Sequence, residues 1–347
     1  MLRWRAAMAA ALYGPDGFFV RPDNRPSAHF RTSAHVGAGF ADAIGRLLTS
    51  VDTALGHPDP LDVVDIGAGR GELLEALVGS VPPELGRRLR PVAVELAAAA
   101  RPPGGEGGVP DTADRPGGGV VTWRRTPPHP VTGLLLATEW LDTIPVDVAE
   151  VDPAGEVRYV LVEPATGREE LGPPVAGPDA AWLRRWWPLS TPGTRAEIGR
   201  PRQEEWASVV ATLRRGAALA VDYGHVAGTR PRFGSLTGYR AGREVSPVPD
   251  GSCDITAHVA MDAVAASGGG GAAWWTQAEA LRALGLTARR PPLALAHRDP
   301  GAYLRGLAAA GLAAELTDPA GLGAHLWLLQ PVALPHPASW FVARLPA

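Results

Sequence analysis

The stretch VVDIGAGRGELLEAL, Val63–Leu77, predicts a short buried strand, a glycine-rich turn and the start of a helix. The apolar residues of Val63–Ile66 form the strand, Gly67–Gly71 the turn, and Glu72–Leu77 favours a helix. Because glycine has no Cβ, such a turn lets the backbone approach a ligand closely. The amides at the helix N-terminus point at the same place. The stretch therefore predicts one unit of an α/β fold with a ligand-binding turn.

The spacing of the glycines separates this turn from a dinucleotide-binding fingerprint. That fingerprint reads G-x-G-x-x-G, whereas the chain reads G-x-G-x-G, with Glu72 in the place of the third fingerprint glycine. The carboxylates of Glu72 and Asp65 repel a pyrophosphate and favour a ligand with cationic and hydroxyl groups. S-adenosylmethionine has a sulfonium, an ammonium, ribose hydroxyls and no phosphate. A purely structural turn is the alternative, because one glycine-rich turn is a weak signal.

Short apolar segments alternate with helical segments along most of the chain, which predicts an α/β fold with a parallel sheet covered on both faces. The expected strands after Val63–Ile66 are Pro91–Glu95, Val120–Trp123, Gly133–Ala137, Ala217–Val221 and His325–Gln330. The expected helices are Met1–Leu12, Gly37–Leu55, Gly71–Val78, Gln277–Leu284 and Pro300–Ala310.

Residues 146–216 interrupt this alternation before the fifth strand. We expect this insert to hold a hairpin, Val146–Val151 with Val157–Val162, and tryptophan-bearing helices around Trp182–Trp187 and Glu204–Leu213. Beyond residue 224 we expect a loop-rich stretch. The chain is thus divided into an N-terminal helical extension, residues 1–58, and a main domain, residues 59–347, that contains the insert.

Acidic residues follow three predicted strands, at the edge where open α/β sheets bind ligands. Glu95 can accept hydrogen bonds from ribose hydroxyls; a solvated acid at a helix start is the alternative. Glu139 and Asp142 lie three residues apart on an expected helical turn, so both can face one pocket. Alternatively, their charges complement a helix dipole. Asp222 and Tyr223 either line the pocket or cap the sheet.

Composition excludes several classes of protein. The chain has 347 residues, of which 46% are hydrophobic, and its net charge of −3 argues against a general nucleic-acid-binding surface. Cys253 is the only cysteine, which excludes an internal disulfide and a multi-cysteine metal site. No apolar run approaches the roughly 18 residues of a membrane span, and Met1–Leu12 lacks the cleavage site of a signal peptide. We therefore expect a cytoplasmic protein without metal, nucleic-acid or membrane partners.

Eight segments carry a resemblance that covers most of the chain in order. They are ALYGPDGFF (Ala11–Phe19), HFRTSAHV (His29–Val36), VVDIGAGRGEL (Val63–Leu73), ATEWLDTIPV (Ala137–Val146), AVDYG (Ala220–Gly224), SLTGYR (Ser235–Arg240), CDITAHV (Cys253–Val259) and TQAEALRALGL (Thr276–Leu286). Together they resemble the MidA family of S-adenosylmethionine-dependent methyltransferases, which is related to the mitochondrial complex I assembly-factor protein arginine methyltransferase. The chain departs from the family at Thr138, at Trp140-Leu141 and at Cys253, which stands in place of alanine.

The resemblance implies a Rossmann-like class I methyltransferase sheet with helices on both faces, an N-terminal helical extension and an insert before strand five. Its implied cofactor is S-adenosyl-L-methionine. The candidate cofactor-binding residues are Asp65, Gly67, Ala68, Gly69, Gly71, Glu95 and Thr138. The implied substrate is a protein or peptide nitrogen, with arginine favoured.

An arginine guanidinium donates two parallel hydrogen bonds to a carboxylate, so Glu139 and Asp142 are the candidates that orient it and stabilise it as its proton leaves. His258 is the candidate proton acceptor, because histidine titrates near neutrality; a structural histidine is the alternative. By resemblance alone, four residues border the substrate mouth: Tyr13, Arg31, Thr32 and Ser33.

Three other functions remain open at this point. The first is a small-molecule O- or N-methyltransferase of a biosynthetic pathway. The second is a non-catalytic assembly factor that keeps the cofactor pocket. An NAD-dependent oxidoreductase is the weakest, because Glu72 breaks the fingerprint.

Overall fold

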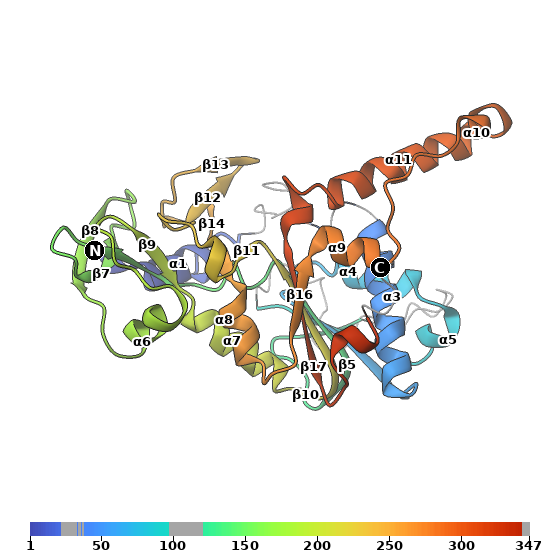
Figure 1. Ribbon diagram of the computed structural model, residues 1–347, viewed down its shortest axis with the longest axis horizontal. Helices are drawn as coiled ribbons and strands as arrows, with labels where there is room; N and C mark the ends of the chain where they lie inside the picture. Colours follow the sequence, from blue (N-terminus) through green and yellow to red (C-terminus); the bar gives the residue numbers. More distant parts are fainter. Residues whose placement is uncertain (22–32, 34–35, 37, 97–120, 342–347) are drawn as a thin grey trace.

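The computed structural model describes residues 1–21, 33, 36, 38–96 and 121–341. Its centre is a seven-stranded sheet with helices on both faces (Figure 1). In chain order the strands are β2 (Leu61–Ile66), β3 (Leu89–Val94), β4 (Thr122–Arg124), β5 (Val131–Thr138), β10 (Leu213–Asp222), β16 (Ala273–Thr276) and β17 (Leu326–Val332).

The order of strands across this sheet positions the site. The strands lie β16-β17-β10-β5-β2-β3-β4, and among the described residues β17 alone runs against its neighbours. The chain passes from β2 to β3 on one side, whereas β5 begins the other half of the sheet on the opposite side of β2. The carboxyl ends of β2 and β5 therefore form a switch point, where open α/β sheets bind ligands. The α/β fold is confirmed, although β17 makes the expected parallel sheet a mixed one.

Helices cover both faces because the central strands are apolar on both sides. One face packs against α3 (Ala38–Leu55), α4 (Glu72–Ser80) and α9 (Gln277–Ala283). The other face packs against α7 (Arg200–Val210) and α8 (Met261–Ser267). The apolar side chains of α3 recur at helical spacing, which turns its buried side to the sheet.

The insert forms a second sheet at one end of the molecule (Figure 1). Its elements are β6 (Asp147–Val151), β7 (Val157–Val162), β8 (Glu169–Pro174), α6 (Gly177–Trp186) and β9 (Arg195–Ile198). β1 (Leu2–Arg3) pairs with β7, and α1 (Trp4–Tyr13) packs against the same sheet. The first helix thus lies with the insert, whereas α3 covers the central sheet. The boundaries at residues 58 and 59 stay a prediction.

The remaining elements are short, apart from one helix. They are α5 (Pro83–Gly86), β11 (Gly224–His225), η3 (Ala227–Thr229), β12 (Thr237–Arg240), β13 (Arg243–Val245), β14 (Asp254–Thr256), β15 (Val259–Ala260), α10 (Leu293–Arg298), α11 (Pro300–Leu316), η4 (Leu322–Ala324) and η5 (Pro337–Ser339). β11 pairs with β15, and β13, β12 and β14 form a three-stranded sheet. The stretch after residue 224 is rich in loops, as expected, with short strands between them.

Several boundaries differ from the expected ones. The helix expected at Met1–Leu12 begins only at Trp4, because the two residues before it pair with β7. The helix expected at Pro300–Ala310 continues to Leu316, because alanine and leucine favour the helix. β4 begins two residues later than the strand expected at Val120–Trp123, whose first residue lies outside the described part of the chain.

Neither a membrane span nor a metal cluster is found in the described ranges. No helix there is long and apolar enough to cross a bilayer. No group of three or more His, Cys, Asp or Glu side chains there is arranged to hold a metal ion.

Candidate active site

The glycine turn joins β2 to α4 at the switch point. Its three glycines have left-handed φ angles, 70° at Gly67, 55° at Gly69 and 85° at Gly71. The amides of Gly67 and Ala68 donate to the carbonyl of Val94 at 2.9 and 3.1 Å, which fixes the turn against β3. A Cβ added at Gly69 would meet no atom within 4 Å. The turn therefore has a rigid base and an open side at Gly69.

Three carboxylates surround this turn. Glu95 follows β3 and accepts a hydrogen bond from the Gly69 amide at 3.0 Å. Asp65 lies within β2 and is only 4% exposed. Desolvation, with the charges of Glu95 and Glu72, raises the pKa of Asp65 to about 7. The negative potential of these acids disfavours phosphate and favours a sulfonium and an ammonium group. The donor and acceptor set fits S-adenosylmethionine.

The segment after β5 lies against the glycine turn. Thr138 ends β5 and is paired with Val221 of β10. The ring of Trp140 packs on Gly67, and its Cδ1 would lie 2.7 Å from a Cβ added there. Glu139 stands between Thr138 and Trp140, so its backbone is held beside the candidate cofactor site.

Glu139 itself has a left-handed backbone, with φ 50°. Its amide donates to the carbonyl of Val221 at 2.7 Å, and its carboxylate accepts the Ser33 amide at 2.8 Å. The expected helical turn across Glu139 and Asp142 is wrong, because this φ takes the chain out of the helical region. Desolvation raises the pKa of Glu139 to about 8. Glu139 is therefore a mostly protonated carboxyl at pH 7 until a cation approaches it.

Asp142 lies deeper, at 2% exposure, in a network of buried polar groups. Its Oδ2 accepts hydrogen bonds from the Tyr223 hydroxyl and, at 2.6 Å, from the Thr256 hydroxyl. Its amide donates to Asp222 Oδ2 at 3.1 Å. Burial, followed by the charge of Asp142, raises the pKa values of Asp222 and Asp254 well above the usual range. Both neighbours therefore favour the protonated form.

Arg202 of α7 connects the parts of this network, and it is not among the residues predicted from the sequence. The guanidinium is buried and donates to the carbonyls of Asp142 (2.6 Å), Ile144 (3.3 Å), Ala257 (2.9 Å) and His258 (3.0 Å). One side chain thus fixes both the turn after β5 and the segment before β15. Nothing in the local sequence distinguishes Arg202 from the surface arginines of the chain, because its partners lie about 55–60 residues away and are all backbone carbonyls.

His258 and Tyr223 connect the buried network to solvent. The His258 side chain is exposed, and its ring centroid lies 5.4 Å from that of Tyr223. Desolvation lowers the pKa of His258, so the ring is neutral at pH 7 and can accept a proton. Desolvation, with the charge of Asp142, raises the pKa of Tyr223 well above its usual range. The candidates Asp142 and His258 are thus brought together on the two sides of Tyr223.

The residues expected at the substrate mouth divide into two groups. The Tyr13 hydroxyl donates to Thr143 Oγ1 at 3.0 Å, which places it against the turn after β5. The Ser33 hydroxyl donates to Gln277 at 3.1 Å, and its amide binds Glu139. Arg31 and Thr32 lie outside the described residues.

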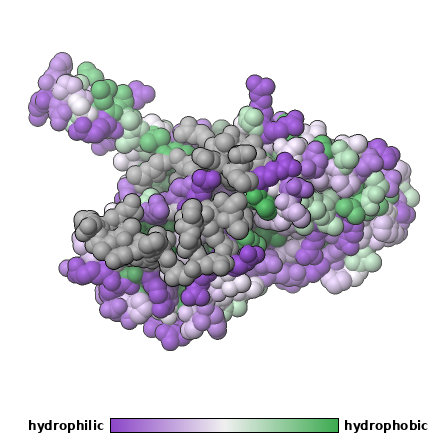
Figure 2. Space-filling view, turned by 180° about the vertical axis from the view of Figure 1, so that it is seen from behind, coloured by the Kyte–Doolittle hydropathy of each residue, from purple (hydrophilic) through white to green (hydrophobic). Residues whose placement is uncertain are grey.

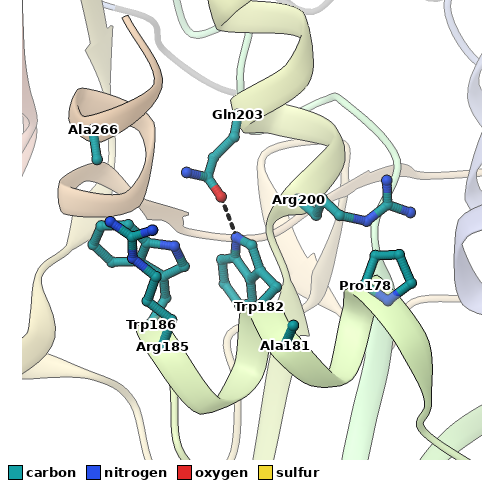
Figure 3. A pocket seen from close by; sticks show the side chains of 8 residues that line it. All are labelled: Pro178, Ala181, Trp182, Arg185, Trp186, Arg200, Gln203 and Ala266. Carbon is teal, nitrogen blue, oxygen red and sulfur yellow. Dashed lines mark hydrogen bonds between the residues drawn. The ribbon is translucent and has the colours of Figure 1, made fainter. Parts of the chain in front are cut away.

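A separate pocket of about 300 Å³ lies between α6, α7 and α8 (Figure 3). Trp182 donates its indole N–H to Gln203, whose amide in turn donates to the carbonyl of Ala263. Arg200 is paired with Asp179 and Glu204. These polar groups are already satisfied within the protein, and the pocket contains none of the candidate residues. We do not assign it to the active site.

Comparison with known proteins identifies the family and the fold. A family model described as "Putative S-adenosyl-L-methionine-dependent methyltransferase" matches residues 43–277, which include the glycine turn, Glu139, Asp142 and His258. The fold is similar to that of a "likely methyl transferase" from Burkholderia thailandensis bound to S-adenosyl-homocysteine. The two chains are 25% identical, with a TM-score of 0.76 over 96% of this chain and 88% of that one.

A second, native crystal structure of an uncharacterized protein from the same organism has the same fold. It is 24% identical, with a TM-score of 0.74 over 96% of this chain and 88% of that chain. No curated protein matches the sequence.

Proposed function

This chain belongs to the family of S-adenosyl-L-methionine-dependent methyltransferases, and on that premise we propose that it methylates a nitrogen of a protein or peptide, with arginine as the favoured acceptor. The observation that carries the proposal is the position of Glu139, one residue from the Trp140 ring that covers the glycine turn. A carboxyl group at that point can hold a cationic acceptor beside the methyl donor. The finer assignment to the MidA type rests on the eight sequence segments that resemble that family.

The cofactor would be held by Asp65, Gly67, Ala68, Gly69, Gly71, Glu95 and Thr138. S-adenosylmethionine, when bound, supplies the methyl group of its sulfonium. The Gly69 amide and Glu95 would lie along the ligand, and Trp140 would exclude water from the side of the turn that it covers. Holding donor and acceptor in line is the main contribution that a protein makes to such a displacement.

The acceptor nitrogen gains a bond to carbon and must lose a proton. We assign Glu139 to bind and orient the cationic acceptor, because the site removes this carboxyl from water. Asp142 accepts a hydrogen bond from the Tyr223 hydroxyl, and the Tyr223 ring contacts the His258 ring. His258 would accept the departing proton and pass it to solvent, since its side chain is exposed.

The test begins with mass spectrometry of methylated proteins and peptides from cells with and without the gene. The proposal expects a methylated protein or peptide nitrogen that disappears with the gene and with Glu139→Gln. A methylated small molecule instead would favour the biosynthetic alternative. A biological role that survives Glu139→Ala with Asp142→Ala, while methyl transfer is lost, would favour the assembly-factor alternative.

The proposal also places the protein in the cytoplasm, with a protein or peptide partner and no nucleic-acid partner. The net charge of −3 supports the expectation that no nucleic acid is a partner. Fractionation of cells that carry the protein would check the location.

A further inference from the structure

The segment TQAEALRALGL, Thr276–Leu286, carries part of the family resemblance but none of the candidate site residues. It joins β16 to α9 through a capping box. The Thr276 hydroxyl accepts the Glu279 amide at 3.2 Å, and the Glu279 carboxylate accepts the Thr276 amide at 2.8 Å. Gln277, the first residue of the helix, donates its amide to the carbonyl of His325 at 2.7 Å. Because His325 directly precedes β17, which pairs antiparallel with β10, Gln277 is fixed at the carboxyl edge of β10.

Gln277 is buried together with Ser33, and both are 0% exposed. Figure 2 shows one face of the molecule, where polar and apolar residues both lie at the surface. Polar side chains usually lie at such a surface, and those that are taken out of water need partners inside the protein. The partners of Gln277 therefore show what this side chain holds in place.

Both polar atoms of the Gln277 side chain have partners. Its Oε1 accepts hydrogen bonds from the Ser33 hydroxyl and from the Trp327 indole N–H, both at 3.1 Å. Its Nε2 donates to the carbonyl of Leu316 at 3.2 Å. Because an indole N–H can only donate, the amide oxygen must face Trp327, and the Ser33 hydroxyl must then be a donor. An apolar side chain at this position could make none of the three contacts.

Ser33 connects Gln277 to Glu139. Its hydroxyl is held by Gln277, and its backbone amide donates to Glu139 Oε1 at 2.8 Å. The backbone amide of Glu139 is held separately, by the carbonyl of Val221 at 2.7 Å. Glu139 is therefore fixed at its backbone by β10 and at its carboxyl group by Ser33.

The Ser33 amide also favours the charged form of Glu139. Desolvation raises the pKa of Glu139 to about 8, the hydrogen bond from the Ser33 amide opposes that rise, and the charge of Asp142 adds to it. Asp222 also interacts electrostatically with Glu139. An N–H donor binds a carboxylate more strongly than a carboxylic acid. Loss of the Ser33 contact would therefore leave a smaller fraction of Glu139 ionised at pH 7.

We propose that Gln277 is a positioning residue, which anchors the Ser33 hydroxyl so that the Ser33 amide holds the Glu139 carboxylate in place. The part of Glu139 in binding the methyl acceptor rests on the function proposed above, whereas the chain of contacts from Gln277 to Glu139 does not.

Carbon-13 NMR titration of the Glu139 carboxyl in the full chain tests this chain of contacts without any acceptor, and Glu139→Gln assigns the signal. Gln277→Met removes the side-chain amide at similar length, and Ser33→Ala removes only the hydroxyl. Each variant should raise the pKa of Glu139 above its wild-type value. The double variant should raise it no further than the single variants do, because both residues act through one contact.

The matched control is Gln330→Met. Gln330 is also 0% exposed and donates its side-chain amide to a backbone carbonyl, that of Gly270, but it lies within β17. This substitution removes a similar buried hydrogen bond and should leave the pKa of Glu139 unchanged. Circular dichroism establishes that each variant is folded.

Calorimetry with the peptide Gly-Arg-Gly and the S-adenosylhomocysteine complex connects the contacts to acceptor binding. At pH 7 the affinity should be about tenfold lower in Gln277→Met than in the wild type. The difference should shrink as pH rises, because Glu139 then ionises in both proteins. Gln330→Met should bind the peptide as the wild type does.

An unchanged pKa of Glu139 in folded Gln277→Met, an equal rise in Gln330→Met, or additive rises in the double variant would each overturn the proposal. If Gln277→Met does not fold, Ser33→Ala decides, and an unchanged pKa of Glu139 there overturns it. A raised pKa in the variants with no peptide binding by the wild type would support the chain of contacts and contradict the arginine acceptor.

Discussion

At the scale of single residues, the site depends on carboxyl groups that the fold removes from water. Asp65, Glu139, Asp222 and Asp254 all have raised pKa values, with desolvation as the largest cause in each case. Such clusters of perturbed acids are typical of functional sites. They are also costly to the folded state, because an unfolded chain ionises them freely.

Asp65 allows a test of how much a buried acid lowers the stability of the folded state. Its pKa is about 4 in an unfolded chain and about 7 in the folded one. Between these values the folded state holds a proton that the unfolded state releases, so the free energy of unfolding falls as pH rises from 4 to 7. The contribution of Asp65 is at most about 4 kcal/mol.

In Asp65→Asn the decrease that Asp65 causes in the free energy of unfolding between pH 4 and 7 should be absent. Urea unfolding at several pH values measures this. The control is Asp16→Asn, at an exposed position. An unchanged pH slope in Asp65→Asn would show that the carboxyl is not desolvated as described.

The raised pKa of Glu139 predicts how the affinity for the acceptor depends on pH. Its carboxyl is protonated below pH 8 in the free protein, and a cationic acceptor binds the ionised form. Acceptor affinity should therefore rise as pH increases toward 8 and level off above it, with release of about one proton on binding at pH 7. Calorimetry in buffers of different ionisation enthalpy measures that proton.

Glu139→Gln should abolish both the pH dependence and the proton release and lower kcat/KM about 100-fold. A neutral acceptor would give no proton release with either protein, which would contradict the assignment of a guanidinium.

At the scale of elements, Arg202 joins α7 to the two segments that carry Asp142 and His258. Arg202→Lys keeps the charge but cannot reach four carbonyls, so buried acceptors lose their partners. We expect a loss of about 3 kcal/mol in the free energy of unfolding, measured by denaturant titration. Arg200→Lys on the same helix is the matched control. Its ion pairs are partly exposed, so the loss should stay below about 1 kcal/mol. Equal losses in the two variants would refute the role given to Arg202.

Part of the fold and of the candidate site could be predicted from the sequence. The strands at Val63–Ile66, Gly133–Ala137 and Ala217–Val221 were predictable because a strand buried on both faces is continuously apolar. The glycine turn was predictable because its glycines adopt conformations that other residues avoid. The contacts of Arg202 were not, because they join residues distant in sequence through backbone carbonyls. The left-handed backbone at Glu139 also left no signal, since glutamate is common in helices.

At the scale of the whole molecule, the reversal of strand order at β2 and β5 brings the separate parts of the site to one edge. The glycine turn follows β2, Glu139 and Trp140 follow β5, and Asp222 and Tyr223 lie at the end of β10. The insert, with α1, adds Tyr13 on the outer side of the turn after β5. The central sheet thus positions the candidate cofactor site, and α1 and the insert lie beside the turn that follows β5.

The central claim is that the glycine turn holds the cofactor, and binding of S-adenosylhomocysteine by isothermal titration tests it most directly. The variants are Gly69→Val, which fills the open side of the turn, and Gly79→Val, which changes an exposed glycine of α4 with equally open surroundings. Wild type and Gly79→Val are expected to bind with similar affinity, and Gly69→Val at least about tenfold more weakly. Equal binding by all three folded proteins, or no binding by the wild type, would contradict it.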